Sequence, residues 1–68
     1  MKLTINNQEK QYEQSELTIQ QLLDLEIPNA QHGVAIAVNE RIVPKTNWTS
    51  THIEDCAEIL IIKATQGG

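Results

Sequence analysis

The sequence contains few of the residues on which several classes of protein depend. Phenylalanine is absent, and the 68 residues include one tryptophan, one tyrosine and one cysteine. The single cysteine, Cys56, excludes an internal disulfide and is typical of a reducing compartment. Five Lys and Arg stand against nine Asp and Glu, which gives a net charge of -4. Because nucleic-acid binding relies on clustered cations, we expect no nucleic-acid partner.

Long hydrophobic runs are also missing. The longest, VAIAV and ILII, are far shorter than the roughly 20 residues that a membrane-spanning helix needs. The opening residues MKLTINNQEK lack the apolar stretch of a signal peptide. We therefore expect no membrane partner and a cytoplasmic location. The length allows one domain, and a hydrophobic fraction of 40% is sufficient for a small folded core.

The chain lacks recognisable catalytic machinery. Its three glycines, Gly33, Gly67 and Gly68, form no phosphate-binding GxxxxGK[ST] loop. His32 and His52 have no companion ligands at metal spacing, and Cys56 has no basic neighbour in sequence. We expect no catalytic residue, no bound cofactor and no metal, which favours a non-enzymatic protein.

Five segments have the patterns of β-strands. Residues 1–6 alternate between apolar and polar side chains, and residues 9–14 form a more polar segment typical of a sheet edge. Asparagines between them favour a tight turn. Residues 33–39, 41–43 and 58–63 complete the set.

One short helix is predicted between the second and third of these strands. Thr18 and Gln21 have the spacing of a capping box, and Leu17 and Leu22 that of a hydrophobic staple. Pro28 disfavours helix at the residue before it, which limits the helix to two or three turns. One helix on one face of a mixed sheet is an α+β arrangement, with the last strand expected beside the first at the centre.

The sequence ends in KATQGG, directly after the last predicted strand. Two readings are open. The glycines are either a frayed end, or they present the carboxylate of Gly68 as a reactive group. Glycine suits the second reading because it has no Cβ and can enter a narrow site in conformations closed to other residues.

Four stretches together resemble the ThiS-type sulfur carriers, which are ubiquitin-like proteins of the β-grasp fold. They are LTIQQLL, VAIAVNERIVPKTNW, IEDCAEILII and the final GG. The resemblance covers the whole chain and implies a β-grasp domain over residues 1–63 with a flexible tail over 64–68. One departure concerns the turn before the last strand, where the family commonly has Asp-Gly-Asp and this chain has Asp55-Cys56-Ala57. If that glycine has positive φ, Cys56 must accept strain or reshape the turn.

The resemblance also implies a function in thiamin (thiazole) biosynthesis. A ThiF-like adenylating enzyme would use ATP to adenylate the Gly68 carboxylate. A sulfur-donor system would then convert it to a thiocarboxylate, which supplies sulfur to a ThiG-like thiazole synthase. Thr65, Gln66 and Gly67 would thread into the activating site. The family pattern places Leu60 and Ile62 outward on the last strand, as a partner-docking surface.

Two alternatives are kept. The small subunit of molybdopterin synthase shares the fold and the tail, but its usual greater length and the match around VNERIVPKTNW favour the thiamin pathway. A non-covalent β-grasp interaction module would use the same surface and have no reaction at Gly68.

Overall fold

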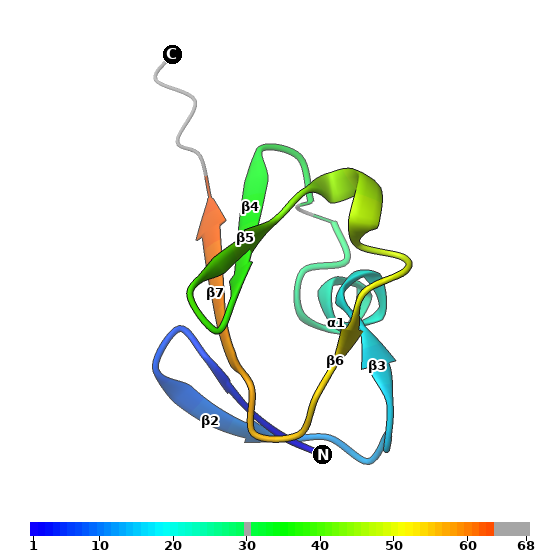
Figure 1. The fold of residues 1–68 in the computed structure, drawn as a ribbon, viewed down its shortest axis with the longest axis vertical. Coiled ribbons are helices and arrows are strands. Elements are labelled where there is room, and N and C mark those ends of the chain that lie inside the picture. The colour runs from blue at the N-terminus through cyan, green and yellow to red at the C-terminus, as the bar shows by residue number, and fades with distance from the viewer. Residues whose placement is uncertain (30, 64–68) are drawn as a thin grey trace.

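The computed structural model of the chain describes residues 1–29 and 31–63, which form a five-stranded mixed sheet with one α-helix packed on it (Figure 1). The main sheet has the order β2-β1-β7-β4-β5. Its strands are β1 (Lys2–Ile5), β2 (Gln8–Gln11), β4 (Val34–Val38), β5 (Arg41–Val43) and β7 (Glu58–Lys63), and the helix is α1 (Ile19–Glu26). The predicted β-grasp arrangement is confirmed.

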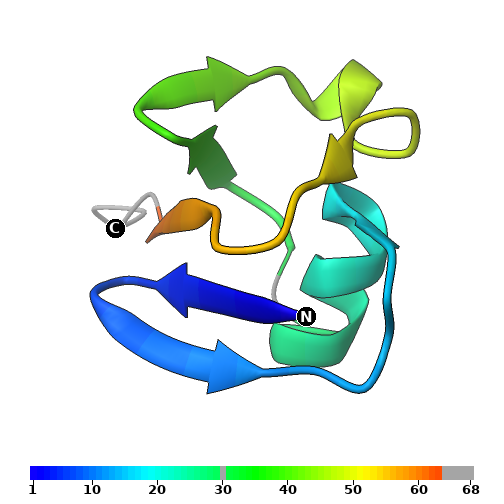
Figure 2. The same cartoon turned by 60° about the horizontal axis from the view of Figure 1, so that its bottom comes forward.

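Strand β7 lies at the centre of the sheet. It pairs in parallel with β1 and antiparallel with β4, and Figure 2 shows it between these two strands. The prediction that the last strand lies beside the first is therefore confirmed. β1 and β4 each continue into an outer strand through a hairpin, so the sheet is built as two hairpins on either side of β7.

The helix begins where the capping box predicts. The Gln21 backbone N–H donates to Thr18 Oγ1 at 3.2 Å, and the Thr18 backbone N–H donates to Gln21 Oε1 at 2.9 Å. Two further N–H groups of the first turn donate to backbone oxygens of the connection between β5 and β7, namely Ile19 to Thr51 and Gln20 to Trp48. These bonds tie the start of the helix to a distant part of the chain.

The structure differs from the sequence-based prediction in three places. The second strand ends at Gln11, whereas the polar pattern predicted residues 9–14. Two short strands, β3 (Leu17–Thr18) and β6 (His52–Ile53), form a separate antiparallel pair that was not predicted. The connection between β5 and β7, for which no helix was predicted, also contains a 3₁₀ helix, η1 (Lys45–Asn47). Segments of two or three residues are too short to show a periodic pattern.

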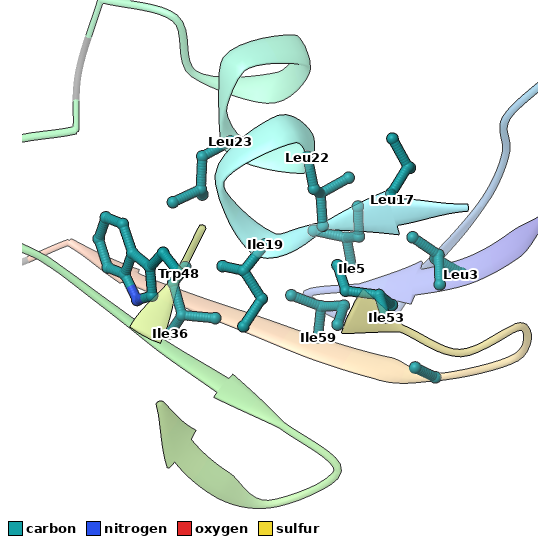
Figure 3. Packing of buried hydrophobic residues seen from close by; sticks show 11 residues of the cluster. Leu3, Ile5, Leu17, Ile19, Leu22, Leu23, Ile36, Trp48, Ile53 and Ile59 are labelled. Carbon is teal, nitrogen blue, oxygen red and sulfur yellow. The ribbon is translucent and has the colours of Figure 1, made fainter. Parts of the chain in front are cut away.

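The hydrophobic core lies between α1 and one face of the sheet. Figure 3 shows Ile19 and Leu22 directed from the helix toward the strands. Trp48, from the connection between β5 and β7, is 1% exposed, and its Nε1 donates to the Val43 carbonyl oxygen at 3.0 Å. The cluster consists of Leu3, Ile5, Leu17, Ile19, Leu22, Leu23, Ile36, Trp48, Ile53, Ala57 and Ile59.

Both hairpins turn on residues with positive φ. Asn6 and Asn7 have φ values of 49° and 68°, and Asn39 and Glu40 have values of 49° and 71°. Positive φ at both turn residues is the requirement of a type I′ hairpin turn, which Asn tolerates better than most residues. The asparagines thus fix where β1 and β4 end.

The turn before β7 also needs a left-handed residue, and here it is Cys56, with φ 67°. The Ala57 N–H donates to the Glu54 carbonyl oxygen at 3.2 Å, which places Cys56 third in a four-residue turn, a position where positive φ favours Gly. The turn is fastened to β1 because the Lys2 N–H donates to Asp55 Oδ1 and the Cys56 N–H donates to the Lys2 carbonyl oxygen, each at 2.7 Å. The bond from Lys2 holds the pKa of the Asp55 carboxyl below its usual range. Cys56 therefore adopts a left-handed conformation that is strained for a residue with a Cβ.

Replacing Cys56 by Gly is expected to stabilise the domain. A left-handed residue with a Cβ costs about 1–2 kcal/mol, and the extra chain entropy of Gly offsets part of this gain. The expected net gain is about 0.5–1 kcal/mol, which raises the thermal midpoint of a domain of this size by roughly 2–8 °C. Thermal unfolding followed by circular dichroism measures it. Cys56→Ala is the matched control, because it removes the thiol but keeps the Cβ; an equal rise in both variants would contradict the backbone explanation.

Candidate functional site

The C-terminal segment follows the central strand directly. β7 ends at Lys63, the last residue that the structure describes. The residues expected to enter a partner's site, Thr65, Gln66 and Gly67, and the expected reactive residue Gly68 lie outside the described residues. The observable part of the site is therefore the end of β7 and the surface next to it.

The side chains of β7 alternate between the two faces of the sheet. Ile59 is 3% exposed in the core, and Ile61 packs against the same cluster. Leu60 and Ile62 point the other way and are 46% and 43% exposed. These exposures confirm the outward facing predicted for Leu60 and Ile62; among the described residues, α1 covers only the inner face.

Neighbouring strands extend this exposed surface. Ile42 of β5 is 64% exposed, and it lies opposite Ala37, which in turn lies opposite Leu60. Ala35 lies opposite Ile62 in the same way. We call this set the outer apolar face; it consists of the exposed Ala35, Ile42, Leu60 and Ile62, together with Ala37, which is 7% exposed between Ile42 and Leu60. Ile42 was not predicted to belong to it, because the three residues of β5 are too few to show which side chains share a face.

A small pocket opens between the outer apolar face and the two hairpin turns. It has a volume of about 170 Å³ and is lined by Thr4, Asn7, Ala37, Glu40, Glu58, Ile59 and Leu60. Small-molecule sites usually measure about 300–1,000 Å³, so this pocket is suited to a side chain rather than to a cofactor. Its wall is acidic at Glu40 and Glu58 and apolar at Leu60. An apolar side chain next to Lys or Arg would complement it.

Within residues 1–29 and 31–63, His, Cys, Asp and Glu side chains nowhere gather in a group of three that could hold a metal ion. The helices found there are all too short or too polar to cross a membrane.

Comparison with known proteins agrees on one family. The ThiS family matches residues 2–68, a range that includes Gly67 and Gly68. The sulfur carrier protein ThiS of Escherichia coli (strain K12) is 31% identical over 68 residues, which cover 100% of both chains. The crystal structure of the thiamine biosynthesis protein ThiS from Geobacter metallireducens superposes with a TM-score of 0.88 at 19% identity, again over 100% of both chains. That identity is low, so the structure supports the fold, whereas the family match and the E. coli relative establish the family. The chain belongs to the ThiS family.

Proposed function

We propose that this chain is a sulfur carrier for thiamine biosynthesis that carries the sulfur atom on the C-terminal carboxylate of Gly68. The observation that carries the proposal is the match to the ThiS family, which extends through the two glycines. The relative from E. coli, named as a sulfur carrier protein and aligned along its whole length, supports the same function.

The chemistry follows from the low reactivity of a carboxylate, whose charge is delocalised and whose oxygen is a poor leaving group. A carboxylate oxygen of Gly68 attacks the α-phosphorus of ATP, and pyrophosphate leaves. Hydrosulfide supplied by the donor system then attacks the acyl carbon, AMP leaves, and the S–H proton is lost to solvent. One oxygen is replaced by sulfur, and the resulting thiocarboxylate delivers that sulfur to thiazole synthase.

The partners supply the catalysis in this proposal. A ThiF-like enzyme binds ATP and forms the adenylate, and a ThiG-like synthase accepts the sulfur. The sequence itself has no GxxxxGK[ST] loop to hold a nucleotide. The chain thus acts as a protein substrate and not as an enzyme.

The fold serves to place the reactive end. Five residues follow Lys63, and an extended chain of that length reaches about 16 Å. Thr65, Gln66 and Gly67 enter the partner's site ahead of Gly68, where the absence of a Cβ at the glycines avoids steric clashes. The outer apolar face docks on the partner and provides binding energy remote from the reacting atom.

Intact-mass spectrometry tests the proposal. The purified chain is incubated with ATP, a ThiF-like enzyme and a sulfur donor, and its mass is expected to increase by the difference between sulfur and oxygen. Omission of ATP is the control, because without adenylation the sulfur nucleophile has no leaving group to displace. An unchanged mass with an activating enzyme that charges the E. coli relative under the same conditions would contradict the proposal.

A further inference from the structure

The last residues of β7 are unequally supported on their two sides. On the β4 side, pairing continues to the end of the strand, where Val34 lies opposite Lys63. On the β1 side, the paired register ends at Ile5 and Ile59. The Asn6 N–H still donates to the Ile59 carbonyl oxygen at 3.0 Å, but the chain then turns away into the β1–β2 hairpin. Figure 2 shows this turn at the same end of the sheet as the end of β7.

Beyond Ile59, the side chain of Asn6 takes over the hydrogen bonding to β7 that the backbone of β1 no longer provides. The Ile61 N–H donates to Asn6 Oδ1 at 2.8 Å, and Asn6 Nδ2 donates to the Ile61 carbonyl oxygen at 3.3 Å. Backbone groups alternate along a strand, so those of Ile61 point to the same side as those of Ile59, away from β4. The carboxamide therefore occupies the place of the next residue of β1. It satisfies both backbone groups of Ile61, two residues before the end of the described strand.

We propose that Asn6 is a positioning residue, which holds the end of β7 against the sheet and thereby sets the direction of Ile62 and Lys63, from which the chain continues toward Gly68. This inference rests on the proposed function, because direction matters only if a partner must receive Gly68 in one orientation. With both edges of β7 held, the docked domain presents the segment along one path. With one edge held, the end of the strand frays and the reacting carboxylate is presented over a wider range of positions.

The second hairpin provides an internal comparison. Asn39 has the same φ as Asn6, 49°, and the same place at the start of its turn. Its side chain also bonds to β7, since the Glu58 N–H donates to Asn39 Oδ1 at 2.9 Å. Glu58, however, is the first residue of β7, at the opposite end of the strand from Lys63. The two asparagines therefore hold opposite ends of β7, Asn6 with two side-chain bonds and Asn39 with one.

The test compares Asn6→Gly with Asn39→Gly in the full chain. Glycine accepts positive φ, so each variant loses the side-chain bonds and keeps the turn conformation. Amide hydrogen exchange is expected to accelerate at Ile61 in Asn6→Gly by roughly fivefold or more, the effect of losing one hydrogen bond of ordinary strength. The exchange at Ile61 in Asn39→Gly should stay within about twofold of wild type.

The functional readout is the rate of charging by the ThiF-like enzyme. In Asn6→Gly, kcat is expected to fall roughly tenfold, while KM stays within about twofold because the docking face is intact. Asn39→Gly should retain wild-type kcat and KM. Asn6→Asp, which keeps the acceptor for the Ile61 N–H and loses the donor to its carbonyl oxygen, should give intermediate values of both exchange and kcat.

Failure of the positioning role can be distinguished from failure of the proposed function. If wild-type chain is charged and the two Gly variants have equal kcat, or if Asn6→Gly changes KM alone, the positioning role is overturned while the proposed function stands. If wild-type chain is not charged, the proposed function fails and the positioning role fails with it. Unchanged exchange at Ile61 in Asn6→Gly would overturn the inference on structural grounds alone.

Discussion

Deletion of Gly68 is expected to abolish charging while leaving the folded domain unchanged. The shortened chain ends at Gly67, and its carboxylate falls about 3.3 Å short of the reacting position. Because a misplacement of even 1 Å can cost about a hundredfold in rate, the thiocarboxylate product should be undetectable by intact mass. The thermal midpoint should not change, since the described strands and helix end at Lys63.

Two comparisons make this deletion informative. Gly68→Ala keeps the length and the carboxylate but adds a Cβ, so partial activity in this variant would separate a steric requirement from a requirement for length. Binding of the deletion variant to the ThiF-like enzyme should persist, because the outer apolar face is unaltered. If the deletion variant binds its partners and also restores growth without thiamine in a strain lacking the carrier, the chain is a non-covalent interaction module and the carrier function is wrong.

The elements that could be predicted from the sequence are those specified by local chemistry. Thr18 and Gln21 satisfy each other's backbone groups within one turn, so their spacing alone fixes the start of the helix. The alternation in residues 58–63 could be read in the same way, but alternation by itself does not say which face is inward. The family pattern supplied that choice, and the burial of Ile59 confirms it.

The features that escaped prediction depend on contacts between distant residues. The bond between Asn6 and Ile61 joins positions 55 apart, and nothing in the sequence around either residue indicates it. The complete burial of Trp48 depends on the path of the connection over the core and on its bond to the Val43 carbonyl oxygen. Strands of two residues such as β3 and β6 exist only because the folded chain brings them together.

The role of Gly67 and Gly68 could not be predicted from local chemistry for a different reason. Hydrophobic pattern and turn chemistry explain the domain, and they say nothing of why a chain should present two glycines beyond it. A sheet with one helix leaves its outer face open whatever the protein does. A carrier is indicated when the open face is followed by the two C-terminal glycines, as in the match to the ThiS family, which extends over both. The docking role of the outer face is thus the part of the proposal that most needs its own experiment.

Leu60→Glu is expected to weaken association with the ThiF-like enzyme by roughly 3- to 10-fold through lost apolar contact alone. Full burial of a leucine is worth about 1.5–3 kcal/mol, and each 1.4 kcal/mol changes affinity tenfold. Leu60 is 46% exposed, so docking can bury only about half of that surface. The new carboxylate would also stand beside Glu58 on the same face of β7, which opposes burial further. Because Leu60 lies outside the core, the free energy of unfolding should change by less than about 1 kcal/mol, the span of strand propensities. Calorimetric titration gives the affinity, and thermal unfolding gives the stability.

Leu25→Glu is the matched control. Leu25 belongs to α1, outside the outer apolar face, and its exposed fraction of 49% is close to the 46% of Leu60. The two variants have the same change in charge and lose similar exposed apolar surface, so a general effect of acidity would weaken both equally. If the outer apolar face is the docking surface, Leu60→Glu should lose affinity for the ThiF-like enzyme and Leu25→Glu should not. The charging rate of Leu60→Glu should then recover at saturating enzyme, because Gly68 is intact. Equal affinities for the two variants would exclude the outer apolar face as the docking surface, and unfolding of Leu60→Glu would show that Leu60 supports the domain itself.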